Sequence, residues 1–237
     1  MLSVKNLNSG YDKFCVLYDV NIEVPDKQVS VVVGPNGAGK TTLLNSISGL
    51  ATVTGGEIIY REENITGIPP YVAPKIGISM VPQTGNVFAG LTVMENLIMA
   101  GYTLDSEEVE EQAKEVLEFF PALKDFVGRK AGTLSGGERR MLAIGMGLVR
   151  KPKLMLLDEV SMDLAPILAK RVIAKVKELR DEFGLTILLV EQMAKAALEI
   201  GDNAYLLVSG EMRYSGDPKE LLSNPELGAL YLGIKNQ

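Results

Sequence analysis

Apolar residues along this chain gather in short continuous blocks, which alternate with stretches of helical periodicity. The blocks at residues 29–33, 153–157 and 185–190 contain very few polar residues. A strand with one face in water alternates polar and apolar side chains, whereas a strand covered on both faces is apolar throughout. We therefore predict an α/β fold whose central sheet is mainly parallel and buried on both sides.

Residues 2–7 and 16–24 follow a different pattern, in which apolar positions alternate with polar ones and Asn, Ser, Gly and Asp interrupt the runs. Alternation broken by turn-forming residues is typical of antiparallel strands. We expect these segments to form a small antiparallel sheet that flanks the main one.

The region at residues 83–152 shows helical patterns and no strand pattern. Its helical stretches lie at residues 92–100, 106–120 and 138–149. The middle stretch has one apolar face, as in a helix that packs on a core. This stripe is formed by Val109, Ala113, Val116, Leu117 and Phe120. We predict a single domain over residues 1–237, in which a helical subdomain at 83–152 interrupts a core and antiparallel β subdomain built from 1–82 and 153–237.

Composition narrows the possible chemistry. The chain has 237 residues, no histidine and a single cysteine, Cys15, so it has no imidazole base or imidazole metal ligand and cannot form an internal disulfide. Lys plus Arg number 24 and Asp plus Glu 30, a formal net charge of −6. Such a charge provides no overall attraction for nucleic acid, which we do not expect as a partner.

No run approaches the ~18 apolar residues that span a bilayer, so we expect any role at a membrane to be performed from outside the lipid.

One glycine-rich segment carries a specific chemical signal. Residues 34–41 read GPNGAGKT, which matches G-x-x-x-x-G-K-[ST], between the apolar block 29–33 and a helix-compatible stretch. Glycines let backbone N–H groups turn toward a phosphate, the helix N-terminus favours an anion, the Lys40 ammonium reaches the β- and γ-phosphates, and the Thr41 hydroxyl binds Mg²⁺. The predicted nucleotide-binding residues of this segment are Gly34, Pro35, Asn36, Gly37, Ala38, Gly39, Lys40, Thr41 and Thr42.

A second signal follows another apolar block. Residues 153–157 are followed directly by Asp158 and Glu159. Beside a phosphate loop, Asp158 is expected to help hold Mg²⁺, and Glu159, one residue nearer to the γ-phosphate, can accept a proton from an attacking water molecule. An acidic pair is common at strand ends, so its meaning here depends on the phosphate loop.

The segment LSGGE, residues 134–138, allows two interpretations. Ser135 and Glu138 fit a capping box that starts the following helix. A capping box does not require Gly136 and Gly137, which weaken a first helical turn, whereas a backbone approached by an anion does. The same atoms can cap the helix in one subunit and present the Ser135 hydroxyl and the glycine N–H groups to a phosphate bound by another.

In this order and spacing, GPNGAGKTT, Gln83, LSGGE and LMLLDE resemble the ATP-binding-cassette (ABC) ATPases over essentially the whole chain. The resemblance implies a P-loop NTPase with a RecA-like, mainly parallel core, a flanking antiparallel β subdomain and an inserted helical subdomain. It also implies ATP and Mg²⁺ as cofactors, and hydrolysis of ATP to ADP and phosphate. Within this superfamily, MLAIGMGL, LLDEVSMDLAPI, LLVEQ and the closing YLG are similar to the ATP-binding subunit of branched-chain amino-acid importers.

The resemblance further implies a sandwich of two subunits, in which ATP lies between residues 34–42 of one and 134–138 of the other. Neither subunit then holds a complete site. Tyr11 stands where the family has an aromatic residue that stacks on adenine. Gln83 matches a glutamine that touches Mg²⁺ or the attacking water and joins the core to the helical subdomain. The implied catalytic residues are Lys40, Gln83, Glu159 and Gln192, and the implied metal-binding residues are Thr41, Gln83 and Asp158.

This sequence departs from the common family pattern at several positions. Gln192 stands where many members have a histidine after the last core strand; its amide can donate a hydrogen bond to the γ-phosphate but cannot become a cation. Subunits of the branched-chain type resemble this chain in lacking that histidine. Val160 stands where the family usually has proline, and Asp163 where it usually has glycine. Both changes fall in the loop expected to lie between subunits.

As implied by the resemblance, the chain drives an importer from the cytoplasm, as a peripheral subunit on the inner face of the cell membrane. Its implied partners are a second ABC ATPase subunit, identical or different, separate transmembrane permease subunits and, indirectly, a solute-binding protein. Two alternatives stay open, an importer subunit for urea or amides and a soluble ABC ATPase that acts on a macromolecular assembly. Soluble members tend to carry coiled-coil insertions or two cassettes in one chain, whereas each motif occurs once here. A phosphotransferase or GTPase would give LSGGE no role.

Overall fold

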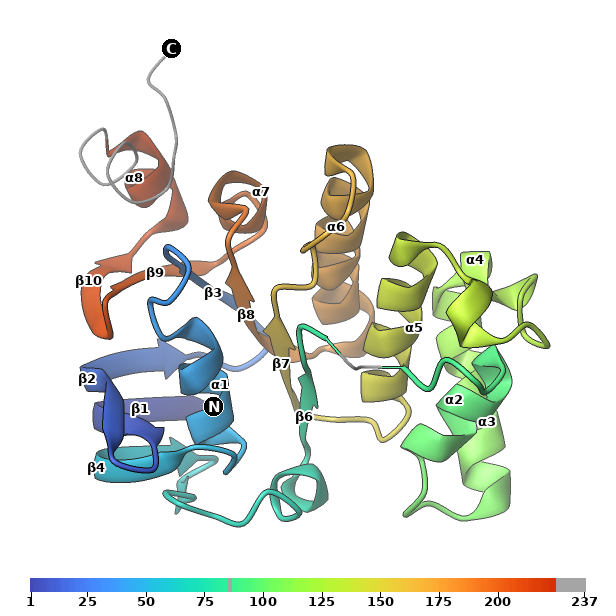
Figure 1. The fold of residues 1–237 in the computed structure, drawn as a ribbon, viewed down its shortest axis with the longest axis horizontal. Coiled ribbons are helices and arrows are strands. Elements are labelled where there is room, and N and C mark those ends of the chain that lie inside the picture. Colours follow the sequence, from blue (N-terminus) through green and yellow to red (C-terminus); the bar gives the residue numbers. More distant parts are fainter. Residues whose placement is uncertain (85–86, 225–237) are drawn as a thin grey trace.

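The computed structural model describes residues 1–84 and 87–224, and its centre is a six-stranded sheet in the order β10-β9-β3-β8-β7-β6 (Figure 1). The pairs β6–β7, β7–β8, β8–β3 and β3–β9 are parallel, and β10 pairs antiparallel with β9. The strands are β3 Val29–Val33, β6 Ile78–Val81, β7 Leu154–Asp158, β8 Thr186–Glu191, β9 Asn203–Val208 and β10 Glu211–Gly216. The predicted α/β fold with a mainly parallel central sheet is confirmed.

Alternate residues of the central strands face two different hydrophobic cores. In β8, Leu189 belongs to one cluster of buried residues and Leu188 to the other, and both side chains are fully buried. Neither face of this strand is exposed to solvent, so its sequence shows no alternation of polar and apolar residues. β3 has the predicted bounds, while β7 and β8 begin and end one residue later than predicted because Asp158 and Glu191 continue the strand pairing.

The second sheet is antiparallel, in the order β2-β1-β4-β5. Its strands are β1 Leu2–Tyr11, β2 Phe14–Val24, β4 Thr52–Tyr60 and β5 Glu63–Asn64. Helix α1, Lys40–Ile47, lies between the two sheets (Figure 1), and its buried Leu43, Leu44 and Ile47 pack in one cluster with residues of both. The antiparallel sheet expected from residues 2–7 and 16–24 is thus present.

Helices α6, Pro166–Phe183, and α7, Ala194–Leu198, cover the opposite face of the central sheet. Helix α8, Pro218–Ser223, packs beside β9 and β10. Short 3₁₀ turns lie at Ala73–Ile76 and Ala131–Thr133.

The helices between β6 and β7 lie together at one side of the molecule and are drawn in green to yellow in Figure 1. Its helices are α2 Val93–Ala100, α3 Ser106–Phe119, α4 Pro121–Lys124 and α5 Gly136–Leu148. The predicted apolar stripe of α3 is buried. α5 begins at Gly136, two residues earlier than predicted, because Ser135 already caps the helix by accepting a hydrogen bond from the Glu138 N–H.

Strands β6 and β4 are among those that the sequence-based prediction does not contain. β6 has the short apolar run ISMV, which periodicity alone does not distinguish from a piece of helix. β4 contains Gly55 and Gly56, and Gly56 adopts a left-handed backbone at φ +84° where a Cβ atom would lie 2.3 Å from Asn6 O. Glycine at such a close approach interrupts the alternation that marks a strand. The closing YLG motif, residues 231–233, lies outside the described residues.

No helix among the described residues combines the length and apolar character needed to cross a bilayer.

Candidate functional site

The glycine-rich segment forms a loop between the end of β3 at Val33 and the start of α1 at Lys40. Gly39 adopts a left-handed backbone at φ +104°, and a Cβ atom there would lie 2.6 Å from the Leu17 side chain. Only glycine adopts this turn without strain. The loop borders a cleft of about 330 Å³. The cleft is lined by Val16, Asn36, Gly37, Ala38, Gly39, Lys40, Thr41, Thr42, Gln83, Glu159 and Met162.

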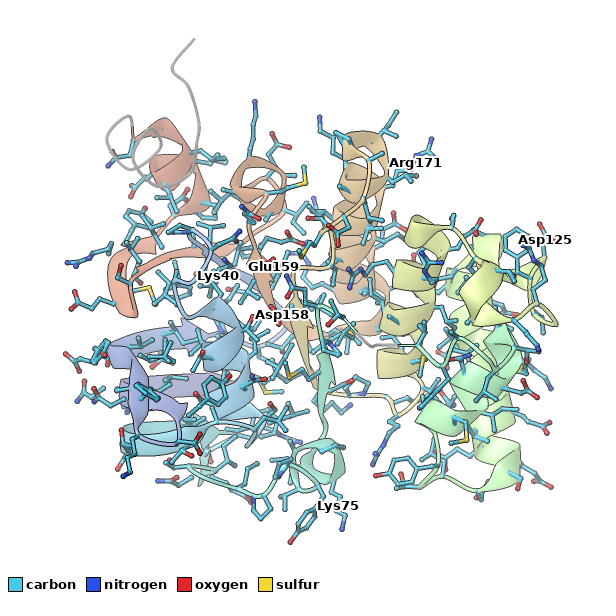
Figure 2. The ribbon with its side chains drawn as sticks, viewed as in Figure 1. Lys40, Lys75, Asp125, Asp158, Glu159 and Arg171 are labelled. Atoms are coloured by element: carbon cyan, nitrogen blue, oxygen red, sulfur yellow. The ribbon has the colours of Figure 1, made fainter. Side chains whose placement is uncertain are left out.

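Lys40 is the cation at the centre of this cleft, and it is only 4% exposed to solvent. Its Nζ donates to the backbone carbonyls of Gly34 at 3.0 Å and Pro35 at 3.1 Å. It also lies 3.0 Å from Glu159 Oε1, while Gln83 Nε2 donates to Glu159 Oε2 at 2.8 Å. Figure 2 shows Lys40, Asp158 and Glu159 close together near the middle of the molecule. The structure thus brings together the predicted phosphate-binding lysine, the predicted base and the predicted glutamine.

Asp158 lies at the end of β7 and contacts the first turn of α1. The Thr41 hydroxyl donates to Asp158 Oδ1 at 3.1 Å, and Asp158 is 1% exposed. Burial raises the pKa of Asp158 to about 6, although the hydrogen bond from Thr41 opposes this shift. A hydroxyl and a carboxylate of this kind suit Mg²⁺, which proteins usually bind through one or two carboxylates plus substrate phosphates. Among the described residues, no three acidic, His or Cys side chains are placed so that they could hold a metal ion together.

The loop after Asp158 contains two residues with left-handed backbone. Glu159 has φ +44° and Asp163 has φ +61°. Asp tolerates this conformation better than most side chains, which explains how it replaces the usual glycine. Val160 is fully buried, and Glu159 N donates to Val190 O at 2.9 Å. The structure therefore accommodates both departures noted in the sequence.

The LSGGE segment lies apart from the cleft within one chain. Ser135 and Glu138 form the capping box of α5, with Glu138 N donating to Ser135 Oγ at 3.4 Å and Ser135 N donating to Glu138 Oε2 at 2.7 Å. Gly136 is next to Leu164, and Gly137 is next to Leu168. None of these predicted nucleotide-binding residues lines the cleft beside Lys40.

Other predicted residues that do not line the cleft are Gly34, Pro35 and Asp158, which border its lining residues in the chain, and Tyr11 and Gln192, which come from other segments. Tyr11 is 40% exposed at the end of β1, and its hydroxyl accepts a hydrogen bond from Asn45 Nδ2 at 2.6 Å. Gln192 is exposed and directly follows β8. Neither of these two side chains lines the cleft beside Lys40.

Sequence reasoning missed several residues around the site. Arg140 Nη1 donates to the backbone carbonyl of Gln83 at 2.9 Å and so joins α5 to the loop that follows β6. Val16 and Met162 line the cleft. Glu191 accepts two hydrogen bonds from Ser161. Only Glu191 had a sequence signal, since it ends an apolar strand as Asp158 does.

A phosphate loop after β3, with an acidic strand end on β7 and the strand β8 between them, defines the class of P-loop nucleotide-binding proteins. The family described as ABC transporter matches residues 17–162, more than half of the chain. The chain belongs to the ABC transporter family.

Relatives resemble the chain along its whole length. It is 49% identical over 234 residues to a probable branched-chain amino acid transport ATP-binding protein, LivF, of Archaeoglobus fulgidus, with 99% of each chain covered. It is 42% identical over 233 residues to the high-affinity branched-chain amino acid transport ATP-binding protein BraG of Pseudomonas aeruginosa. That similarity covers 98% of this chain and 100% of the relative.

Among solved structures, a dimeric ATP-binding cassette in a post-hydrolysis state, bound to ADP and Pi, superposes with a TM-score of 0.80 at 25% identity. The similarity covers 92% of this chain and 99% of that one.

Proposed function

We propose that this chain is the ATP-hydrolysing subunit of an importer for branched-chain amino acids. The observation that carries the proposal is the buried contact of Lys40 with Glu159 in a phosphate-loop cleft, within a chain similar along its length to two branched-chain transport ATP-binding proteins. The cleft supports ATP hydrolysis, and the relatives support the transported solute.

In the proposed reaction, water attacks the γ-phosphorus of ATP, the bond to the β,γ-bridging oxygen breaks, and ADP leaves. Lys40 holds the β- and γ-phosphates, and Glu159 accepts the proton of the attacking water. Gln83 donates to Glu159 and orients its carboxylate. Thr41 and Asp158 would hold Mg²⁺, which offsets charge on the phosphates when bound.

A second ATPase subunit, identical or different, completes the site in this proposal. The Ser135 hydroxyl and the N–H groups of Gly136 and Gly137 start α5 away from the cleft of their own chain. In a second subunit they can bind the γ-phosphate, since a helix N-terminus with glycine N–H groups favours an anion. Tyr11 stacks on adenine and Gln192 donates to the γ-phosphate in the same proposal. The dimeric structural relative with ADP and Pi supports this assembly.

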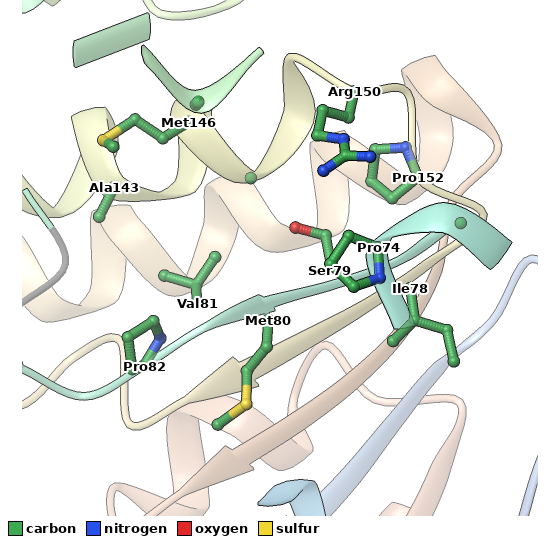
Figure 3. A pocket seen from close by; sticks show the side chains of 13 residues that line it. Pro74, Ile78, Ser79, Met80, Val81, Pro82, Ala143, Met146, Arg150 and Pro152 are labelled. Carbon is green, nitrogen blue, oxygen red and sulfur yellow. The ribbon is translucent and has the colours of Figure 1, made fainter. Parts of the chain in front are cut away.

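We propose the division into subdomains and the permease contact together. Residues 83–152 act as a helical subdomain on the core of 1–82 and 153–237. A pocket of about 210 Å³ lies between β6 and α5 (Figure 3), lined by Val81, Met146 and Arg150 among others. Its mixed lining, with apolar side chains and the cation Arg150, and its position between the two parts suit a cytoplasmic segment of a permease. The chain then works as a peripheral subunit on the inner face of the membrane, with a solute-binding protein as an indirect partner.

The test is affinity capture of the tagged full-length chain from detergent-solubilised membranes of its source cell, followed by mass spectrometry and by transport assays of the captured complex. Recovery of multi-span permeases, with ATP-dependent uptake of leucine, isoleucine or valine, supports the proposal. Uptake restricted to urea or amides would change the solute. Recovery of soluble assemblies alone would replace the transport role and leave the ATPase site in place.

A further inference from the structure

Glu191 is a buried carboxylate that none of the proposed steps uses. It is the last residue of β8 and is fully buried. Its backbone stands in register with Val33, which directly precedes the phosphate loop, and the next residue in the chain is Gln192. Glu191 therefore lies at the edge of the sheet where the phosphate loop, the acidic pair and Gln192 meet.

The side chain of Glu191 reaches across to the loop that follows β7. Its Oε1 accepts from Ser161 N at 2.9 Å, and its Oε2 accepts from Ser161 Oγ at 2.6 Å. Ser161 is itself only 3% exposed. Two residues before Ser161, Glu159 N donates to the backbone carbonyl of Val190 at 2.9 Å. The turn at residues 159–161 is thus fastened to the end of β8 at both of its ends.

The turn that these hydrogen bonds attach to β8 contains a residue with a strained backbone. Glu159 has a left-handed backbone at φ +44°, which non-glycine side chains adopt rarely and which persists only when the surroundings fix it. The Glu159 carboxylate lies between Lys40 Nζ and Gln83 Nε2 only while the turn keeps this shape. Hydrogen bonds made by a buried carboxylate are short and strong, so Glu191 is well suited to fix the turn.

We propose that Glu191 is a positioning residue for ATP hydrolysis: through Ser161 it fixes the turn 159–161 and hence the direction of the Glu159 carboxylate. The inference rests on the proposed ATPase function. Glu191 does not touch the nucleotide in this proposal, so its loss affects the rate of the chemical step and leaves nucleotide binding largely intact.

The chain offers matched variants for this test. In Glu191→Gln the side chain can still accept from Ser161 N through Oε1 and donate to Ser161 Oγ through Nε2, without charge. Glu191→Ala removes both contacts with Ser161, together with the hydrogen bond that the carboxylate accepts from the Met193 backbone, and Ser161→Ala removes one of the two Ser161 contacts. Asp202→Ala is the control, because Asp202 Oδ2 accepts from Val29 N at 2.8 Å at the opposite end of β3. It likewise fastens a loop to a central strand, far from the cleft.

Steady-state ATPase kinetics and thermal unfolding are measured on the full-length chain in complex with the subunits that copurify with it. Since small misplacements of a catalytic group cost up to about 10²-fold in rate, Glu191→Ala is expected to lower kcat at least about tenfold, with KM within about threefold of wild type. Ser161→Ala is expected to lower kcat as well. The double variant Glu191→Ala/Ser161→Ala should be no slower than Glu191→Ala alone, because both substitutions remove the same Glu191–Ser161 contact. Glu191→Gln keeps kcat within about threefold, and Asp202→Ala lowers the unfolding temperature without lowering kcat.

Wild-type kcat in a folded Glu191→Ala variant overturns the inference, as does equal loss in Glu191→Gln and Glu191→Ala. If Glu191→Ala does not fold, the Ser161→Ala variant tests the inference in its place. An unchanged kcat in Ser161→Ala then overturns the inference. A wild-type complex that binds ATP without hydrolysing it would contradict the proposed function itself, and the positioning role with it.

Discussion

Lys40 and Glu159 form a buried ion pair, with Nζ 3.0 Å from Oε1 and side chains that are 4% and 8% exposed. The ammonium proposed to bind the phosphates of ATP is therefore neutralised by the carboxylate proposed to activate water. A phosphate that enters the cleft has to replace this contact. The same pair thus influences both the affinity for nucleotide and the rate of hydrolysis.

The variant Glu159→Gln separates these two effects. The amide has no charge to hold Lys40, so we expect ATP to bind several times more tightly. It cannot accept the proton of water, so we expect turnover to fall by about 10²- to 10⁴-fold, the usual contribution of a general base. Equilibrium binding of a fluorescent ATP analogue and phosphate release measure the two quantities, and size-exclusion chromatography detects the closed dimer expected to accumulate with ATP.

Glu178→Gln is the control for this prediction, because Glu178 pairs with Lys175 on α6 outside the cleft. It should change neither quantity. Turnover like that of wild type in Glu159→Gln would remove Glu159 from the mechanism.

The pKa of Asp158 predicts a dependence of stability on pH. Burial raises it from 3.8 to about 6, so between about pH 4 and pH 6 the native state binds more protons than the unfolded chain. The free energy of unfolding therefore falls as the pH rises through this window, by an amount on the order of 2–3 kcal/mol for this group. Asp158→Asn should flatten that part of the profile and raise the stability of the nucleotide-free chain at pH 7.

Urea unfolding from pH 4 to pH 7 measures this profile. The same substitution should remove the strengthening of ATP binding by Mg²⁺, and in wild type that strengthening should weaken as the pH falls below about 6, because Mg²⁺ has to displace the proton. A profile of the same slope in Asp158→Asn would show that another group titrates in this window.

The sequence predicted the parts of the site that are local in the chain. GPNGAGKT carries the turn, the lysine and the hydroxyl within one segment, and Asp158 with Glu159 ends one apolar block. Contacts between distant segments gave no comparable signal: Arg140 reaches the carbonyl of Gln83, 57 residues away, and Glu191 reaches Ser161, 30 residues away. These contacts depend on the order of strands in the sheet, which short periodic patterns do not specify.

Ser135 allows its capping role to be separated from a phosphate-binding role. Ser135 caps α5 and Thr92 caps α2, each within a complete capping box. Replacing either by Ala should therefore cost about 1 kcal/mol of stability. Only Ser135→Ala should also lower ATP turnover, on the order of 10²-fold, as loss of one donor to a developing charge does. Thermal unfolding and turnover of both variants in the assembled complex provide the comparison.

Equal turnover in Ser135→Ala and Thr92→Ala would mean that Ser135 serves the helix alone. A turnover loss confined to Ser135→Ala, at equal stability, would support a phosphate contact supplied by a second subunit.

Tyr11, which we propose to stack on adenine, pairs directly with Phe14 across the β1–β2 hairpin. Tyr11 is 40% exposed and is held by Asn45, whereas Phe14 is 80% exposed. Stacking of a base on an aromatic ring is worth about 1–3 kcal/mol, so we expect Tyr11→Ala to weaken ATP binding roughly 5- to 150-fold.

Tyr11→Phe keeps the ring and should bind ATP nearly as wild type, which separates stacking from the hydrogen bond with Asn45. Phe14→Ala should leave the affinity unchanged. The reverse order, with a loss in Phe14→Ala and none in Tyr11→Ala, would transfer the stacking role to Phe14, because the hairpin places both rings at the same end of β1. Titration with ATP and with inorganic triphosphate, which has no base, checks the assignment: only ATP binding should respond to the loss of the ring.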